Sequence, residues 1–351
     1  MPIVARAPVG LRYPALTHHH PRVLFFADCG ARIGGGHVMR SLTLAEAAAD
    51  LGAVCAFAAP PEAAAILAAF GSGRVEALPA SATTANAAGL ASQWRADWVV
   101  VDHYRLALAD EGALRAPGRR IAVIDDLAER PRDCDLLLDP SYGRTANAYT
   151  GLIPPAAAVL TGPQYALVRP QFAAARPPAL ARRKDAPVRR ALVSLGLTDV
   201  GGVTAQVVEA LAPHLGEMLL DVAVGRSAPS LERLQALAAA DRRIRLHVEV
   251  RDMAALMTAA DMAVGAGGSS TWERCCLGLP TLTLVLADNQ RPLAAAFDRD
   301  GISPAVDLGG LPGGWRGMAG DAALRLRLSQ ASAALCDGLG AGRVAEALVR
   351  A

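Results

Sequence analysis

The sequence is poor in aromatic residues and nearly balanced in charge. Phe, Trp and Tyr make up 4% of the 351 residues, so the interior must be built mainly from aliphatic side chains between helices and sheets. This composition favours an α/β fold over a β-sandwich. Lys and Arg number 35 against 33 Asp and Glu, a net charge of +2. Such a chain has no overall field that would attract nucleic acid or an acidic membrane. A small anionic ligand would therefore need hydrogen-bond donors at its own binding site.

The sequence also lacks the cysteine spacing of a zinc site or a disulfide framework. Its six cysteines are scattered without a CxxC pair, and two are adjacent, which predicts reduced thiols in a cytoplasmic protein. No stretch of about 18 uninterrupted apolar residues is present, so we expect no membrane span. Prolines and arginines interrupt residues 1–21 where a signal peptide would be apolar, and we expect a disordered lead-in.

What is present is a repeated alternation of short apolar runs and alanine-rich helical patterns, which predicts parallel strands joined by helices. The length exceeds what one core usually organises, so we expect two Rossmann-like domains. We assign residues 22–175 to the first, the proline- and arginine-rich residues 176–190 to a linker, and residues 191–351 to a second, nucleotide-binding domain. The last helical pattern, from residue 322, could pack back on the first domain. Expected strands cover 23–29, 53–59, 98–102, 121–125, 135–139, 191–196, 219–225, 244–250, 261–267 and 281–286.

The first of two glycine-rich turns reads ARIGGGHVMR and links an apolar strand to a helix. Its three glycines allow close approach of a ligand to the backbone, and exposed amides at a helix start favour an anion. His37 follows them directly, and a neutral imidazole there can take a proton from water. The alternative is a structural histidine that binds a nearby carbonyl.

The second turn, VGAGGSSTWE, places three hydroxyl residues before a helix, with Glu273 one turn further on. Amides and hydroxyls suit a diphosphate, and a carboxylate nearby could accept both hydroxyls of a ribose. The turn has neither the lysine of a Walker loop nor the GxGxxG pattern. Alternatively, the hydroxyls cap the helix and Glu273 completes a capping box.

Further polar residues follow apolar runs, at the sheet edge where ligands of parallel sheets collect. The adjacent Asp125 and Asp126 face opposite ways on an extended chain, and we interpret both as structural caps. The other polar residues at such positions are Asp28, Asp102, His103, Tyr104, Asn289 and Gln290.

Seven motifs in order resemble one enzyme family between about residues 22 and 302. They are RIGGGHVMRSLTLA, VVVDHY, IDDLAER, LTGPQYALVRPQF, SLGLTD, GAGGSSTWERCCLGLP and ADNQ. The family is the UDP-sugar hydrolases of pseudaminic acid biosynthesis, which act on UDP-2,4-diacetamido-2,4,6-trideoxy-β-L-altropyranose. The resemblance implies the GT-B fold of the muramyl glycosyltransferase of peptidoglycan synthesis, with two Rossmann-like domains whose parallel sheets face each other across a cleft.

The resemblance also implies roles for individual residues. His37 would be the general base for water attacking the anomeric carbon, releasing UDP and the free sugar without a metal or other cofactor. The nucleotide would contact Gly268, Ser269, Ser270, Thr271 and Glu273. The sugar or phosphates would contact Asp28, Gly35, Gly36, Tyr104, Asn289 and Gln290. The expected partner is thus a small UDP-sugar, with neither nucleic acid nor membrane involved.

Two positions depart from the family pattern. Phe26 stands where an arginine is usual, and Leu197 stands where the turn after the strand usually has a second glycine. Two other functions use similar loops. A glycosyltransferase would also need an acceptor groove, and a binding protein would hold the nucleotide-sugar without catalysis.

Overall fold

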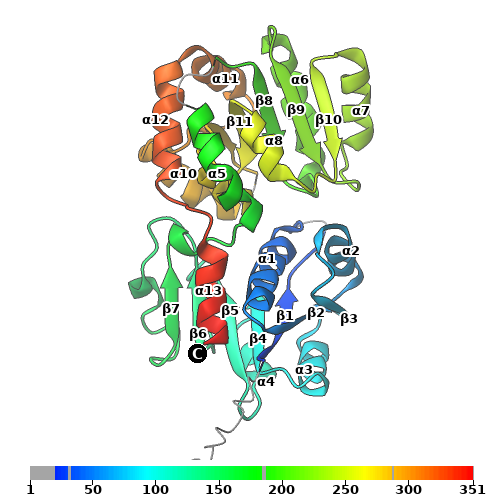
Figure 1. Ribbon diagram of the computed structural model, residues 1–351, viewed down its shortest axis with the longest axis vertical. Helices are drawn as coiled ribbons and strands as arrows, with labels where there is room; N and C mark the ends of the chain where they lie inside the picture. Colours follow the sequence, from blue (N-terminus) through cyan, green and yellow to red (C-terminus); the bar gives the residue numbers. More distant parts are fainter. Residues whose placement is uncertain (1–19, 31–32, 184–186, 287, 351) are drawn as a thin grey trace, which may run out of the picture.

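The computed structural model of the chain describes residues 20–30, 33–183, 187–286 and 288–350. Within these ranges the chain forms two α/β units, one above the other in Figure 1, each built on a parallel sheet. The first sheet has the order β3-β2-β1-β4-β5-β6-β7 and the second β10-β9-β8-β11-β12-β13. The predicted fold class, α/β with two parallel sheets, is confirmed. The expected lead-in, residues 1–21, lies outside the described residues except for its last two.

The described strands begin and end within a few residues of the expected apolar runs. The first sheet contains β1 (Arg22–Ala27), β2 (Val54–Ala59), β3 (Glu76–Pro79), β4 (Trp98–Asp102), β5 (Arg120–Ile124), β6 (Leu136–Asp139) and β7 (Ala158–Thr161). The second contains β8 (Arg190–Ser194), β9 (Leu219–Val224), β10 (Ile244–Val248), β11 (Met262–Ala266), β12 (Thr281–Leu284) and β13 (Ala305–Val306). The sequence did not predict β3, β7 and β13, which are all edge strands.

Helices connect the strands and cover both faces of each sheet. They are α1 (Gly36–Asp50), α2 (Pro61–Phe70), α3 (Thr84–Gln93), α4 (Leu108–Leu114), α5 (Pro170–Arg182), α6 (Val203–Leu211), α7 (Leu231–Ala240), α8 (Met253–Ala259), α9 (Ser270–Cys276), α10 (Arg291–Arg299), α11 (Leu311–Gly320), α12 (Ala322–Ala333) and α13 (Gly340–Val349). In the described ranges no helix is both long and apolar enough to cross a membrane.

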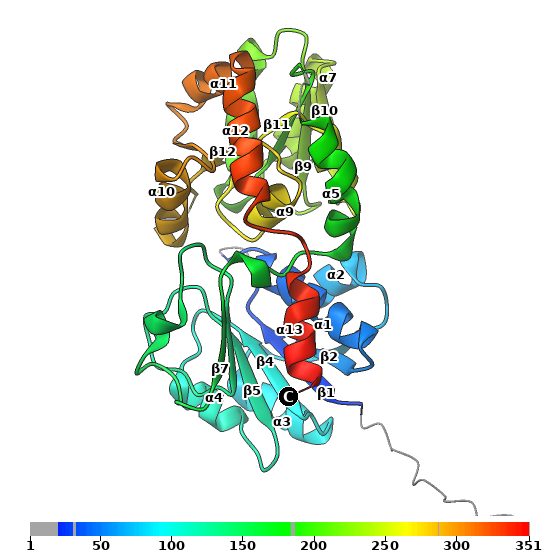
Figure 2. The same ribbon diagram turned by 60° about the vertical axis from the view of Figure 1, so that its left-hand side comes forward.

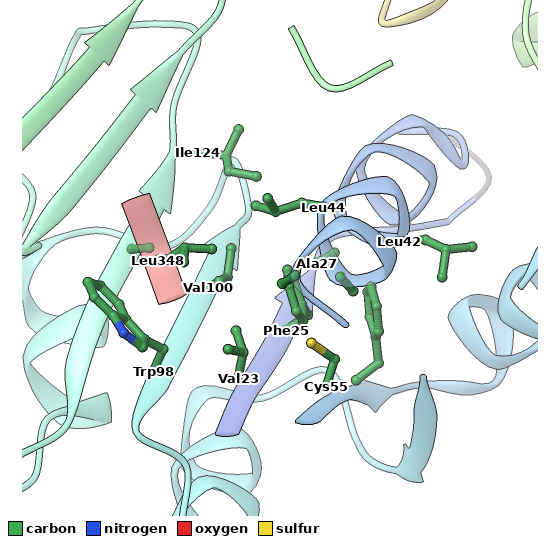
Figure 3. Packing of buried hydrophobic residues seen from close by; sticks show 14 of the residues in the cluster. Val23, Phe25, Ala27, Leu42, Leu44, Cys55, Trp98, Val100, Ile124 and Leu348 are labelled. Carbon is green, nitrogen blue, oxygen red and sulfur yellow. The ribbon is translucent and has the colours of Figure 1, made fainter. Parts of the chain in front are cut away.

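The first sheet is buried on both faces because its central strands are apolar throughout. In β1, Val23 and Phe25 point into the cluster formed with α1, α2 and α13, whereas Leu24 and Phe26 join the opposite cluster with α3 and α4. Figure 3 shows the first of these clusters. The second sheet is covered by helices on both faces in the same way.

All six cysteines are free thiols.

The expected linker, residues 176–190, is helical as far as residue 182. These residues form the second half of α5, which packs against α8 and α9 of the second unit. Arg182 and Arg189 are exposed, but two other arginines of the segment bind backbone carbonyls. Arg176 donates to the carbonyls of Cys276, Ala333 and Cys336, and Arg183 donates to carbonyls of α8 and the end of α9. Residues 184–186 lie outside the described ranges.

The end of the chain returns to the first unit. It leaves α12 in the upper unit and enters α13 in the lower one, beside α1 (Figures 1 and 2). Val344, Ala345 and Leu348 of α13 are buried in the same cluster as Val100 and Trp98 of β4 (Figure 3). The final helix is therefore part of the first hydrophobic core.

Leu348→Ala should lower the free energy of unfolding by about 2–5 kcal/mol, because it opens a cavity in that core. Urea denaturation measures the change. Leu339→Ala is the matched control at the N-cap of the same helix, since Leu339 is 55% exposed, and it should change the value by no more than about 0.5 kcal/mol. Equal effects of the two substitutions would contradict the docking of α13.

Candidate active site

The order of the first sheet places its switch point between β1 and β4. Chain connections leave these two strands in opposite directions, and such a point opens a crevice at the carboxyl ends of the strands. Asp28 follows β1, while Asp102 ends β4 and pairs in register with Ala27. The start of α1 brings His37 to the same edge.

His37 is held by a buried carboxylate. Its Nδ1 lies 2.5 Å from Oδ1 of Asp102, which is fully buried, and His37 itself is 6% exposed. Because an ionised carboxylate only accepts, this contact places the ring proton on Nδ1 and leaves Nε2 as the basic nitrogen. The alternative of a histidine bound to a nearby carbonyl does not describe this contact.

Asp102 also binds two other residues of α1. Arg40 donates from Nε to Oδ2 at 2.7 Å and from Nη2 to Oδ1 at 2.6 Å, and Ser41 Oγ donates to Oδ2 at 3.2 Å. Burial on its own would raise the pKa of Asp102, but the charges and hydrogen bonds of Arg40 and His37 hold that pKa well below its usual range. Asp102 is therefore ionised at neutral pH, where it faces the start of α1.

A second carboxylate extends this network toward Tyr104. Arg40 Nη1 donates to Oδ2 of Asp126 at 3.0 Å, and the Tyr104 hydroxyl donates to the same oxygen at 3.3 Å. The Tyr104 ring meets the His37 ring edge to face, with centroids 4.5 Å apart. Asp126 thus supports the site, contrary to its interpretation as a cap. Asp125 is the cap, since it accepts the amide of Leu127 at 3.0 Å.

Asp28 lies beside this network in a buried position. It is 2% exposed, and its Oδ2 lies 3.4 Å from Nδ1 of His103, while Arg105 reaches its Oδ1 at 3.5 Å. Burial lowers the pKa of His103, despite the opposite effect of Asp28. The amide of Arg105 donates to Nδ1 of His103 at 3.1 Å. Phe26, at the first departure from the family pattern, is 1% exposed and packs near the His103 ring.

The second sheet repeats the arrangement, with its switch point between β8 and β11. The loop after β11 carries Ser269, Ser270 and Thr271 into α9. Thr271 Oγ1 donates to the carbonyl of Ala266 at 3.2 Å, and no side chain caps the first turn of α9. The predicted capping box is therefore not formed.

The two glycine-rich loops lie directly against each other. A Cβ placed on Gly36 would be 3.5 Å from Ser269 Oγ, and one on Gly35 would be 3.4 Å from Leu197 Cδ2. Gly34 has a φ of +86°, a conformation that favours glycine, and a Cβ there would lie 3.1 Å from the hydroxyl of Thr198. The glycines therefore bring the helix start that carries His37 to the hydroxyl loop of the second unit.

The structure gives the following surroundings for the remaining predicted contacts. Glu273 is paired with Arg169, with Oε1 and Nη2 3.5 Å apart. Burial raises the pKa of Glu273, although Arg169 opposes this effect. Gln290 accepts the amide of Leu286 at 3.1 Å, and a Cβ on Gly267 would be 3.1 Å from its Cβ. Gly268 is exposed. The side chain of Asn289 lies outside the described part of the structure.

The sequence analysis placed Asp102 at the sheet edge and interpreted Asp126 as a cap, but it did not predict the pairing of either residue with His37 or Arg40, and it missed Arg40. One available signal was the spacing of His37 and Arg40, which places both on one face of a helix. The position of Asp102 at the end of a fully apolar strand was another. In the described ranges, no three His, Cys, Asp or Glu side chains are grouped so that they could hold a metal ion.

Comparisons with known proteins support the fold and a distant relationship. No protein-family model matches the sequence. The UDP-2,4-diacetamido-2,4,6-trideoxy-beta-L-altropyranose hydrolase of Campylobacter jejuni is 25% identical over 287 residues, which cover 80% of this chain and 97% of the hydrolase. The crystal structure of Acinetobacter baumannii MurG gives a TM-score of 0.63 at 15% identity, covering 94% of this chain and 99% of MurG.

A third protein, S. aureus MnaA in its structure with UDP, gives a TM-score of 0.62 at 14% identity, covering 94% of this chain and 96% of MnaA. At these identities the solved structures show the fold alone. The chain has the GT-B fold expected from its motifs, and it is a distant homologue of the Campylobacter hydrolase.

Asp102→Asn should lower the free energy of unfolding by about 3–5 kcal/mol near neutral pH, because it removes the fully buried carboxylate that pairs with Arg40 and leaves that arginine only Asp126 as an ionised partner. The depressed pKa of Asp102 gives stability that is present above the ordinary carboxyl value of about 4 and is lost as the pH falls through the folded-state value. Urea denaturation at several pH values should therefore show the difference from wild type shrinking below about pH 4.

Asp50→Asn is the control for this comparison. Asp50 pairs with Arg74 at the surface, where its side chain is 60% exposed, and its loss should cost less than about 1 kcal/mol. A difference between wild type and Asp102→Asn that stays constant down to about pH 3 would contradict the ionised state of Asp102.

Proposed function

We propose that this protein is a hydrolase that cleaves a UDP-2,4-diacetamido-2,4,6-trideoxy sugar into UDP and the free sugar. The observation that carries the proposal is the buried His37–Asp102 pair, which lies at the junction with the hydroxyl loop of the second unit. A base in the first unit and hydrogen-bond donors for an anion in the second suit a reaction in which water attacks the sugar and UDP leaves. The distant homology to the Campylobacter hydrolase supports the substrate class.

The mechanism uses His37 as the general base. Its Nε2 takes a proton from water, the water oxygen attacks the anomeric carbon, and the bond from that carbon to the phosphate oxygen breaks. The bonding pair leaves with UDP, and the proton on His37 passes to solvent. Asp102 holds the ring and stabilises the imidazolium that forms. A single displacement by one base inverts the anomeric configuration.

The second unit would hold the leaving group. Backbone amides from Gly268 to Thr271 and the hydroxyls of Ser269 and Ser270 are the donors proposed for the diphosphate, and Glu273 is the proposed acceptor for the ribose hydroxyls. Tyr104, which meets the His37 ring, is proposed to contact the sugar or phosphates, together with Asp28, Gly35, Gly36, Asn289 and Gln290. Leu197 fills the space beside Gly35, so this chain would hold the diphosphate less closely there than a glycine would allow.

Incubation of the protein with UDP-2,4-diacetamido-2,4,6-trideoxy-β-L-altropyranose as the sole substrate tests the proposal. A hydrolase releases UDP and free sugar in equal amounts, which phosphorus and proton NMR detect. A glycosyltransferase of the same fold would release UDP only after an acceptor is added, and a binding protein would release none. Either of those results would refute the hydrolase.

His37→Asn should lower turnover by roughly two to four orders of magnitude and change UDP affinity by only a few-fold. The reason is that a base acts on the water, whereas the nucleotide is held elsewhere. Steady-state rates and calorimetry measure the two quantities. A loss of UDP binding in proportion to turnover would make His37 a binding group and not the base.

Glu273→Ala should weaken UDP binding by about 1–3 kcal/mol, the scale of lost hydrogen bonds to a carboxylate. Glu232→Ala is the matched control, because Glu232 also lies in the first turn of a helix in the same unit but is exposed. If calorimetry shows the same UDP affinity for Glu273→Ala as for wild type, Glu273 does not bind the nucleotide and has only its contact with Arg169.

A further inference from the structure

A buried arginine lies beneath the hydroxyl loop of the second unit. Arg274 is 2% exposed and lies in α9, one turn after Ser270. Its Nη1 donates to Ser270 Oγ at 2.9 Å, and its Nη2 donates to the carbonyl of Ala266 at 2.7 Å and to Thr271 Oγ1 at 3.0 Å. One guanidinium group thus joins the end of β11 to both hydroxyls at the start of α9.

Strand β11 lies directly against this side chain. A Cβ placed on Gly265 would lie 2.4 Å from Cζ of Arg274, a distance that no real side chain could tolerate. The guanidinium group therefore lies against the backbone of β11, and a side chain at residue 265 would force Arg274 to shift from this position. The first glycine of the GAGG motif thus leaves space for the arginine.

The positive charge of Arg274 is only partly compensated, because the nearby charge of Glu273 acts on it without forming an ion pair with it. Among the described residues Arg274 forms no ion pair, and its sequence neighbour Glu273 is paired with Arg169. Burial lowers the pKa of Arg274 to about 10, so the group is still charged at neutral pH. Burying a guanidinium group without an opposite charge is costly. An anion bound at the loop would supply that charge.

Arg183, another buried arginine of this unit, has a purely structural role and serves as a comparison for Arg274. Arg183 donates to the carbonyls of Met257, Ala260 and Leu277. These carbonyls lie in or just after the last turns of α8 and α9, where helix ends carry partial negative charge. Arg274 meets a single carbonyl, and its other two acceptors are neutral hydroxyls of the loop.

The contacts also fix which way the hydroxyls donate. The Thr271 hydroxyl already gives its hydrogen to the Ala266 carbonyl. Ser270 Oγ accepts from Arg274, which can only donate, so the Ser270 hydrogen is left to donate elsewhere. Ser270 is thus the hydroxyl prepared for an external acceptor, and Thr271 supports the loop from within.

We infer that Arg274 is a positioning residue for the diphosphate of a bound nucleotide, holding Ser270 as a donor and offsetting the phosphate charge from below. This inference rests on the proposed function only in requiring that a nucleoside diphosphate binds at this loop. It does not depend on the identity of the sugar or on hydrolysis.

Binding of UDP and of uridine to wild type, Arg274→Lys and Arg274→Met tests the inference, with calorimetry for UDP and NMR titration for uridine. Because Arg274 serves the phosphates, UDP affinity should fall by about 10-fold in the lysine variant and by up to about 100-fold in the methionine variant. Uridine affinity should stay within about two-fold, because the nucleoside carries no phosphate. Arg183→Lys is the control and should leave both affinities unchanged.

Ser270→Ala and the double variant Ser270→Ala/Arg274→Lys complete the test. If Arg274 acts through Ser270, the two losses in UDP affinity should not add. Equal losses for UDP and uridine in the Arg274 variants, or fully additive losses in the double variant, would overturn the inference. Wild-type protein that binds another nucleoside diphosphate in place of UDP would refute the proposed substrate alone. Wild-type protein that binds no nucleoside diphosphate would refute both.

Discussion

The buried carboxylate of Asp102 is the group on which the first half of the site depends. It receives hydrogen bonds from His37, Arg40 and Ser41, all in the first two turns of α1. A fully buried anion must keep its partners, so α1 cannot shift along the end of β4 without leaving a charge unpaired. The same bond that anchors the helix also fixes which nitrogen of His37 is basic. Fold stability and the chemistry of the site therefore share one interaction.

The second half of the site arises because the second sheet repeats the strand order of the first. Each switch point carries a glycine-containing loop, and the absence of side chains at Gly35 and Gly36 lets the two loops meet. The histidine comes from one unit and the hydroxyls come from the other. Arg274 and Asp102 have similar roles, because each is a buried charged group that orients other side chains. Arg274 holds Ser270 and Thr271, and Asp102 holds His37.

The sequence could predict the elements that are buried on both faces. Central strands such as β4 are continuous apolar runs, whereas the edge strand β3 is mostly exposed and reads EALP. The prolines and arginines of residues 176–190 indicated a linker, but residues 176–182 belong to α5, and Arg176 there binds backbone carbonyls of the second unit. His37 was found from its local motif. Asp102 was placed at the sheet edge, but its pairing with His37 was not predicted, because that pairing requires β4 to lie beside β1, an adjacency that no local pattern records.

In the proposed mechanism, water activated by His37 attacks the anomeric carbon. The most direct test is to hydrolyse UDP-2,4-diacetamido-2,4,6-trideoxy-β-L-altropyranose in ¹⁸O-labelled water and determine which bond breaks. Attack of activated water at the anomeric carbon places the label in the free sugar and none in UDP, which mass spectrometry of both products resolves. Label in the β-phosphate of UDP would show attack at phosphorus and contradict this mechanism.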